Sequence, residues 1–100
     1  MSLKKYNLAI YITENGLADE KDTQRTQFIK KMLSQAYQAI NKGVKLKGYF
    51  YWSLIDNFEW HHGFWPKFGL IEIDRNNGLT RKPRKSFYDY AKICKNGEVE

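Results

Sequence analysis

The hydrophobic and polar positions along this chain predict an alternation of strands and helices. Residues 8–12 form a short apolar run typical of a buried strand, and Asn15-Gly16 after it is typical of a turn. Apolar residues then recur at helical spacing over residues 28–40, and Gly43 lies just past the end of that pattern. Asp22 precedes the helix and is predicted to cap its start.

A second strand is predicted over residues 46–54, so the chain begins with a β-loop-α-β unit. A helical crossover of this length normally joins parallel strands. Residues 68–74 and 79–83 flank Asn77-Gly78, and this arrangement predicts a small surface hairpin. A final helix is predicted from about Ser86, because the apolar residues that follow it have helical spacing.

Both main strands are almost uniformly apolar, which is typical of strands that are covered on both faces. Two parallel strands and two helices cannot cover each other in that way. The pattern therefore indicates an α/β fold that is a slice of a larger sheet. A complete (β/α)₈ barrel needs about 250 residues, and this chain supplies roughly a quarter of its strands.

The composition predicts a folded chain and weighs against nucleic-acid binding. Hydrophobic residues make up 42% of the sequence, which is too many for a disordered tail. The formal charge is +6, with basic residues clustered at 4–5, 42–47 and 81–85, whereas many of the aromatic residues lie within 49–68. A nucleic-acid stacking surface would interleave aromatic and basic residues. The basic clusters are therefore interpreted as a solvated exterior.

The single cysteine, Cys94, cannot form an intrachain disulfide and is predicted to serve packing. The sequence shows no signal peptide and no long apolar span, so a reducing, cytoplasmic setting is expected. Met1-Ser2-Leu3 is interpreted as an expression scar or a clipped start, and either would make the chain begin within a longer protein.

Two constellations carry candidate chemistry. Glu14 stands where a strand meets a loop, so its carboxylate can face a cleft, although such a glutamate is more often a solvated charge. Residues 52–60 supply two indoles, a carboxylate and an amide. This mixture suits a sugar, because indole faces stack on the C–H patches of the ring, and carboxylate and amide oxygens accept hydrogen bonds from its hydroxyl groups. An aromatic core cluster remains an equal interpretation of these residues. His61-His62 lacks a third ligand at useful spacing, so no metal is expected.

Several motifs resemble family 1 glycoside hydrolases, the retaining β-glucosidases and β-galactosidases. The matching segments are Ile12-Thr13-Glu14-Asn15-Gly16, Asp22-x-x-Arg25, residues 48–60, Gly63-Phe64-x-x-Lys67-Phe68-Gly69-Leu70 and Lys82-Pro83-Arg84-Lys85-Ser86. They cover nearly the whole chain after its first residues. The resemblance implies that residues 1–100 are the C-terminal part of a (β/α)₈ barrel, comprising its last two β/α units and a small surface hairpin.

The resemblance also implies roles for individual residues. Glu14 matches the nucleophile at the end of the seventh strand, and Trp52 matches the indole platform beneath the sugar. Glu59 and Trp60 match the groups that hold the sugar hydroxyls, and Phe68 matches an aromatic residue that lines the same pocket. Relatives that act on 6-phosphosugars typically carry serine in place of Glu59. An unphosphorylated glucoside or galactoside is therefore implied, with no cofactor.

Retaining hydrolysis needs two carboxyl groups about 5–5.5 Å apart. The family's acid/base glutamate lies in a Thr-x-Asn-Glu-Pro motif that this chain lacks, and the resemblance assigns that role to neither Asp56 nor Glu59. The isolated chain is therefore expected to be inactive, with self-association or a complementing barrel fragment as candidate partners. The alternative is a non-catalytic carbohydrate-binding module that uses Trp52, Glu59 and Trp60. A nucleic-acid binder ranks well behind both.

Overall fold

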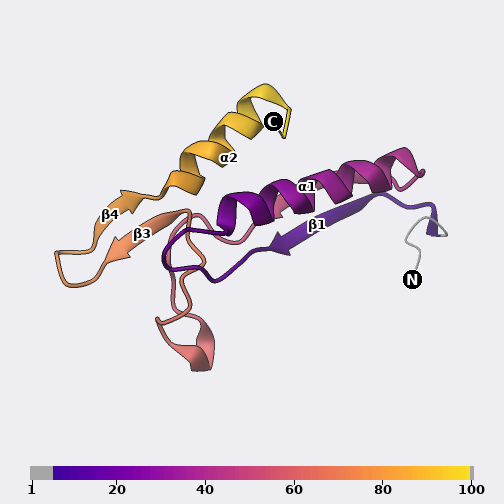
Figure 1. Ribbon diagram of the computed structural model, residues 1–100. Coiled ribbons are helices and arrows are strands. Elements are labelled where there is room, and N and C mark those ends of the chain that lie inside the picture. Colours follow the sequence, from indigo (N-terminus) through magenta and orange to yellow (C-terminus); the bar gives the residue numbers. More distant parts are fainter. Residues whose placement is uncertain (1–5, 100) are drawn as a thin grey trace.

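The computed structural model describes residues 6–99, so Met1-Ser2-Leu3 lies outside the described residues. The elements in chain order are β1 (Ile10–Asn15), α1 (Arg25–Asn41), β2 (Leu46–Tyr51), the 3₁₀ helix η2 (Trp60–His62), β3 (Ile71–Asp74), β4 (Thr80–Pro83) and α2 (Lys85–Asn96) (Figure 1). This is the predicted order of strand, helix, strand, hairpin and helix.

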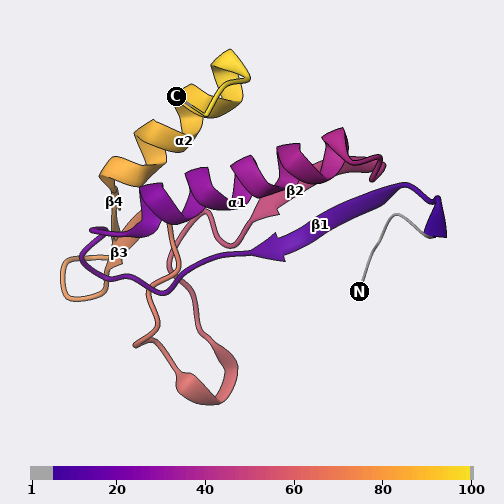
Figure 2. The ribbon, with the colours of Figure 1, turned by 45° about the vertical axis from the view of Figure 1, so that its right-hand side comes forward.

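β1 and β2 form a parallel pair, as the helical crossover predicts, with Ile10 opposite Leu46 and Asn15 opposite Tyr51. The helix α1 lies along this pair, and α2 lies beyond it on the same side (Figures 1 and 2). The antiparallel strands β3 and β4 form the predicted hairpin. Within residues 6–99 the two sheets stay two-stranded and do not close into a barrel.

The second strand ends at Tyr51, three residues before the predicted boundary. Its hydrogen bonding changes partner there, because Ser53 N–H donates to Phe68 O (3.2 Å) and Leu70 N–H donates to Ser53 O (2.9 Å). The same exchange moves the start of β3 from the predicted residue 68 to Ile71. Residues 68–70 therefore close the base of a loop instead of extending the hairpin.

The start of α1 differs from the prediction at its cap. Asp19 accepts hydrogen bonds from the backbone N–H groups of Gln24 (2.8 Å) and Arg25 (3.0 Å), so it satisfies donors that a helix start leaves unpaired. The predicted cap, Asp22, has a φ of 58° and instead binds the side chains of Arg25 and Ser86. The helix end agrees with the prediction, because Gly43 follows the cap with a φ of 97°.

Arg25 is fully buried and joins segments from three parts of the chain. Its Nε donates to the Tyr51 hydroxyl (2.9 Å), and its Nη1 donates to Asp22 Oδ1 (2.6 Å). Its Nη2 donates to the backbone oxygens of Leu17, Asp19 and Lys67. The rigid donor fork of one guanidinium thus holds the loop after β1, the end of β2 and the segment before Phe68.

Asp22 extends this network to α2. Its carboxylate accepts hydrogen bonds from the Ser86 N–H (2.9 Å) and hydroxyl (2.6 Å), at the first turn of the helix. Burial alone would raise the pKa of Asp22, but the hydrogen bonds from Ser86 and Arg25 outweigh burial and lower that pKa. The ion pair therefore stays charged and ties both helices to the strands.

The parallel sheet is covered on one face only. Tyr49 and Tyr51 point toward the helices, where their ring centroids lie 6.5 and 6.2 Å from that of Tyr90. On the other face Tyr11 and Phe50 are 56% and 59% exposed. The strand pattern predicts cover on both faces, so one apolar face lacks its cover within the described residues, as expected of a slice.

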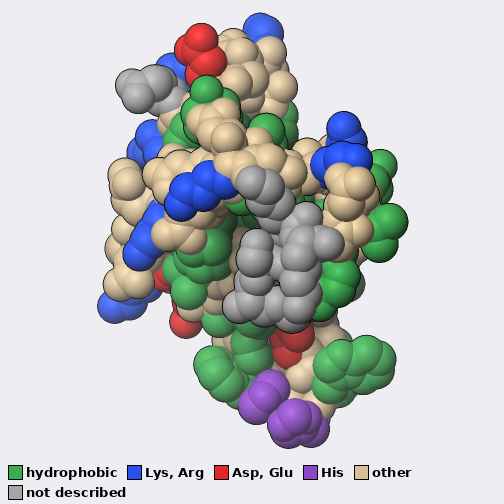
Figure 3. All heavy atoms as spheres, turned by 90° about the vertical axis from the view of Figure 1, so that its right-hand side faces the viewer, with side chains coloured by type: hydrophobic (Ala, Val, Ile, Leu, Met, Phe, Trp, Pro, Cys, Tyr) green, Lys and Arg blue, Asp and Glu red, His purple; other side chains and the backbone are tan. Residues whose placement is uncertain are grey.

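The exposed area of the chain supports the same conclusion. A compact protein of 11.9 kDa exposes about 5,900 Å², whereas this chain exposes 7329 Å². Hydrophobic side chains are plainly visible on the surface in Figure 3.

The predicted packing role of Cys94 is wrong for this structure, because the residue is exposed. Neither helix in residues 6–99 is long and apolar enough to cross a membrane.

Replacing Arg25 with alanine should strongly destabilise the fold. The substitution would leave the Asp22 carboxylate, whose side chain is only 9% exposed, without its charged partner. Such a loss typically costs about 3–5 kcal/mol, against a total stability of roughly 5–15 kcal/mol for a typical domain. Circular dichroism during urea denaturation measures the effect. Lys31→Ala, at an exposed position of the same helix, is the control and should shift stability by less than about 0.5 kcal/mol. Equal stability of the two variants would contradict the structural role of Arg25.

Alkaline pH should destabilise the fold through Tyr49. Burial, together with nearby Tyr90 and Tyr51, raises the pKa of Tyr49 to about 12. Tyrosine in an unfolded chain has a pKa of about 10, so the stabilising contribution is full below about pH 10 and is lost as the pH rises toward 12. Tyr49→Phe should make the urea midpoint less sensitive to pH in this window. The exposed Tyr88→Phe is the control, and an identical slope in both variants would refute the assignment.

Candidate active site

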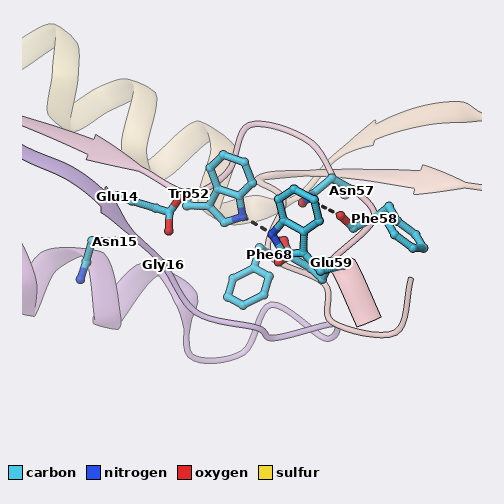
Figure 4. Close-up of a pocket in the computed structure, with 9 residues that line it drawn as sticks. Glu14, Asn15, Gly16, Trp52, Asn57, Phe58, Glu59 and Phe68 are labelled. Atoms are coloured by element: carbon cyan, nitrogen blue, oxygen red, sulfur yellow. Dashed lines mark hydrogen bonds between the residues drawn. The ribbon is translucent and has the colours of Figure 1, made fainter. Parts of the chain in front are cut away.

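A cavity of about 560 Å³ opens beside the carboxyl ends of β1 and β2 (Figure 4). The residues that line it are Glu14, Asn15, Gly16, Trp52, Asn57, Phe58, Glu59, Trp60 and Phe68. All five site residues predicted from the sequence are among them, although they come from three separate segments. The carboxyl ends of parallel strands are the usual place for binding sites in α/β folds.

Glu14 is the next-to-last residue of β1 and is exposed to solvent. The pairing register of β1 is irregular between Ile12 and Asn15, which re-aims the side chains at the end of the strand. Figure 4 shows the Glu14 carboxylate pointing toward Trp52, whereas the side chain of Asn15 points the opposite way. The strand thus directs one carboxylate to the cavity and fixes it through backbone geometry.

Asn15 and Gly16 join the end of β1 to Trp52. The Asn15 side-chain oxygen accepts the Tyr49 hydroxyl (2.9 Å), and its backbone oxygen accepts the Trp52 N–H (2.8 Å). A Cβ on Gly16 would lie 1.9 Å from the Trp52 backbone oxygen, so a side chain there would force the strands apart. The predicted turn at Asn15-Gly16 does not form, because Asn15 completes the strand and the glycine permits close approach instead.

Trp52 follows β2 directly and is 38% exposed. Its indole Nε1–H donates a hydrogen bond to Glu59 Oε1 at 2.9 Å, which Figure 4 marks with a dashed line. Phe68 lines the same cavity from the far end of the loop, where its backbone oxygen accepts the Tyr51 hydroxyl (3.0 Å). An indole, a phenyl ring and a carboxylate therefore meet at one side of the cavity.

The loop between residues 56 and 68 carries Glu59 and Trp60 away from the sheet (Figures 1 and 2). Glu59 N–H donates to Gly63 O (2.7 Å), which closes a tight turn around η2 and leaves Trp60 81% exposed. Phe58 packs edge-on against Phe64 at 5.2 Å, and the Arg75 guanidinium lies 3.8 Å from the centre of the Phe64 ring. These contacts brace the loop against the β3–β4 hairpin.

Asp56 anchors the base of this loop and does not face the cavity as a proton donor. Asp56 is only 4% exposed. Its carboxylate accepts two hydrogen bonds from Arg84 (3.0 and 3.1 Å) and one from Gly69 N–H (2.9 Å). Burial by itself would raise the pKa of Asp56, but the hydrogen bonds and charge of Arg84, with those from backbone N–H groups, lower it. A carboxyl group held this way stays ionised.

The described cavity lining combines aromatic, acidic and amide side chains and includes no cationic one. Glu14 and Glu59 are its two carboxylates, and Asn57 adds an amide. His61 and His62 lie outside it on η2, with ring centroids 4.0 Å apart. Residues 6–99 contain no cluster of three or more His, Cys, Asp or Glu side chains arranged to hold a metal ion.

Four lining residues, Asn15, Gly16, Asn57 and Phe58, were assigned no individual site role by the resemblance. Asn57 is the amide that the sequence analysis counted among the sugar-binding groups, Asn15 and Gly16 were predicted as a turn, and Phe58 was not singled out. Arg25 and Arg84 also belong to the matching motifs and prove to be buried anchors. Positions within a motif thus include both cavity residues and the contacts that support them.

The chain spans about a fifth of the length of the known proteins that it resembles. Beta-glucosidase 42 of Arabidopsis thaliana is 46% identical over 107 aligned residues, which cover 95% of this chain and 22% of that protein. A beta-galactosidase of Saccharolobus solfataricus is 41% identical over 95 residues, covering 95% and 19%. A beta-glycosidase from Pyrococcus horikoshii superposes with a TM-score of 0.91 at 44% identity, covering 97% of this chain and 23% of that one.

The structural match confirms the predicted fold class, a part of a (β/α)₈ barrel that is not closed within residues 6–99. The sequence profile of Glycosyl hydrolase family 1 matches residues 1–99, which is nearly the whole chain. The profile agrees with the order of the matching motifs and with the parallel β1–β2 unit. The chain therefore belongs to glycosyl hydrolase family 1.

Proposed function

We propose that this chain carries the nucleophile side of a retaining β-glycosidase site, with Glu14 as the nucleophile. The observation that carries the proposal is the convergence of Glu14, Trp52, Glu59, Trp60 and Phe68 on one cavity. Because the chain belongs to glycosyl hydrolase family 1, the reaction that we propose for this cavity is glycoside hydrolysis. The substrates of this class are β-linked glycosides.

In the proposed reaction, a carboxylate oxygen of Glu14 attacks the anomeric carbon of the sugar. The glycosidic C–O bond breaks, and the leaving oxygen takes a proton from a general acid. A covalent glycosyl ester on Glu14 results. Water then attacks the anomeric carbon, a base removes the proton of that water, and the Glu14 carboxylate is released. Two displacements at the same carbon retain its configuration.

The cavity lining supports a sugar without a phosphate group. Trp52 and Phe68 offer aromatic faces for the C–H patches of a pyranose, and Glu59 offers a carboxylate that accepts hydroxyl hydrogens. No lysine or arginine lines the described cavity to receive a phosphate. An unphosphorylated β-glucoside and an unphosphorylated β-galactoside both fit this chemistry.

We place the general acid outside the two β/α units of this chain. Retaining hydrolysis needs a second carboxyl group about 5–5.5 Å from the nucleophile. Asp56 is committed to Arg84, and Glu59 is engaged by the indole of Trp52. The isolated chain is accordingly expected to release no product from a glycoside whose leaving group needs protonation.

The uncovered face of the β1–β2 sheet marks where the rest of a complete site would attach. Tyr11 and Phe50 are more than half exposed there. The uncovered face is one part of the surface by which the whole chain exceeds a compact protein of its mass, an excess of about 1,400 Å². A complementing barrel fragment would supply both cover and a general acid, whereas copies of this chain would supply cover alone.

A non-catalytic carbohydrate-binding module is the second candidate function. The observation that favours it is the exposure of Trp60, at 81%, beside Glu59 on a projecting loop. Such a module would bind methyl β-glucoside through Trp52, Glu59 and Trp60 without covalent chemistry at Glu14. Covalent trapping separates the two candidates.

Glu14 should become covalently labelled by a 2-deoxy-2-fluoro-β-glucoside that carries a dinitrophenolate leaving group. This leaving group departs without protonation, so attack by Glu14 does not require the general acid. Fluorine at C2 slows hydrolysis of the glycosyl ester, so the adduct accumulates. Intact-protein mass spectrometry and peptide mapping should find one sugar on Glu14.

Glu14→Gln should abolish the label, whereas Glu20→Gln, at an exposed loop position, should keep it. Sugar binding detected by tryptophan fluorescence without any label on the wild-type chain would support the binding module instead. A label of equal yield on Glu14→Gln would place the nucleophile elsewhere and contradict the proposal.

Self-association of the purified chain should depend on the uncovered sheet face. Phe50→Lys places a charge on this face and should raise the monomer fraction, because burying an unpaired lysine is costly. Sedimentation velocity across a concentration series measures this fraction. Tyr88→Lys, at a position 61% exposed on α2, is the matched control and should behave as wild type. An equal shift in both variants would show that the added charge acts nonspecifically.

A further inference from the structure

We propose that Glu59 positions the indole of Trp52, in addition to any contact of its own with a sugar. This inference rests on the proposed function, because it concerns how the sugar platform is held. The observation behind it is the hydrogen bond from Trp52 Nε1–H to Glu59 Oε1 at 2.9 Å (Figure 4). Trp52 directly follows β2, whereas Glu59, seven positions later, lies on the projecting loop.

The bond uses the only polar hydrogen of the indole, since tryptophan has a single side-chain donor. The acceptor is a carboxylate oxygen, and hydrogen bonds to an ionised acceptor are about twice as strong as neutral ones. A strong contact at the edge of the ring fixes the plane of the ring. The orientation of that plane decides whether a pyranose can stack on its face.

Packing alone does not hold this side chain. Trp52 is 38% exposed, and its backbone N–H is committed to Asn15 O (2.8 Å), which fixes the Cα but leaves the side-chain torsions free. Trp60 and Trp65, which lie in the same region of the chain, are 81% and 68% exposed. The contact with Glu59 therefore sets Trp52 apart from both of the other indoles.

Glu59 is itself anchored well enough to act as a fixed point. Its backbone N–H donates to Gly63 O at 2.7 Å, and the loop that carries it is held at its base by the buried pair of Asp56 and Arg84. With Oε1 engaged by the indole, Oε2 of Glu59 remains to accept a sugar hydroxyl. One carboxylate thus sets the angle of the stacking face and offers a hydroxyl acceptor beside it.

The test uses the indole N–H signals of the three tryptophans in ¹⁵N NMR spectra of the wild-type chain, recorded without added sugar. The Trp52 indole hydrogen should exchange with solvent at least about tenfold more slowly than those of Trp60 and Trp65, as expected for a hydrogen bond to a charged group. Its ¹⁵N relaxation should report an order parameter near that of rigid backbone, about 0.85. Exchange as fast as in the other two indoles would overturn the proposal.

Variants identify the acceptor. Glu59→Ala should remove the exchange protection and lower the order parameter below about 0.6, whereas Glu59→Gln, which keeps an oxygen acceptor, should retain part of the protection. Glu14→Gln, which alters the other carboxylate of the cavity, and Glu20→Ala, outside it, should leave the Trp52 signal ordered. Circular dichroism verifies that each variant is folded. An ordered Trp52 indole in folded Glu59→Ala would refute a positioning role.

A sugar-binding measurement connects the contact to the site. Trp52→Phe keeps an aromatic face but lacks the N–H, so it should bind methyl β-glucoside about 2- to 10-fold more weakly, the effect of freeing one immobilised side chain. Unchanged affinity would contradict a positioning role. The positioning role of Glu59 and the proposed nucleophile can be refuted independently of each other. The NMR measurement needs no sugar, and the labelling of Glu14 needs no fixed indole.

Discussion

The buried guanidinium of Arg25 is the contact on which the rest of this structure depends. Only Ile29, Leu70 and Ile93 are buried hydrophobic residues among those that the structure describes, so apolar packing alone gives little cohesion. Arg25 compensates by binding backbone and side-chain oxygens from the loop after β1, from β2 and from the segment before Phe68. A charge buried in this way is tolerated because each of its three nitrogens donates to an acceptor.

A second ion pair, Asp56 with Arg84, performs the corresponding task at the base of the loop that carries Glu59. It joins the base of the Glu59 loop to the residue just before α2, while Asp22 joins Arg25 to the first turn of the same helix. The polar cavity residues need little packing of their own, because these two pairs fix the segments that carry them. Rigid support behind an exposed site is what a reaction with strict geometry requires.

Much of the fold was predictable from periodicity, because the apolar stripe of α1 and the turn signal of the β3–β4 hairpin are local properties. The boundaries set by distant partners were not. The strand β2 ends early because Ser53 pairs with residues 68 and 70, and α1 is capped by Asp19 because Asp22 is drawn to Arg25 and Ser86. A local pattern reports neither the pairing of Ser53 with residues 68 and 70 nor the bond from Ser86 to Asp22.

The candidate site was predictable by resemblance, since Glu14, Trp52, Glu59, Trp60 and Phe68 do meet at one cavity. Their mutual contacts were beyond the sequence. The bond between Trp52 and Glu59 depends on how the intervening loop folds, and the close approach at Gly16 depends on the pairing of β1 with β2. Resemblance names the residues, whereas the tertiary structure determines which atoms they offer.

The most direct test of this account is a crystal structure of the chain with a bound unhydrolysed β-glucoside, such as a thioglycoside. The account predicts the sugar ring stacked on Trp52 with its anomeric carbon about 3–3.5 Å from a carboxylate oxygen of Glu14. A sugar bound elsewhere, or one whose anomeric carbon faces away from Glu14, would contradict the claim that this carboxylate is the nucleophile.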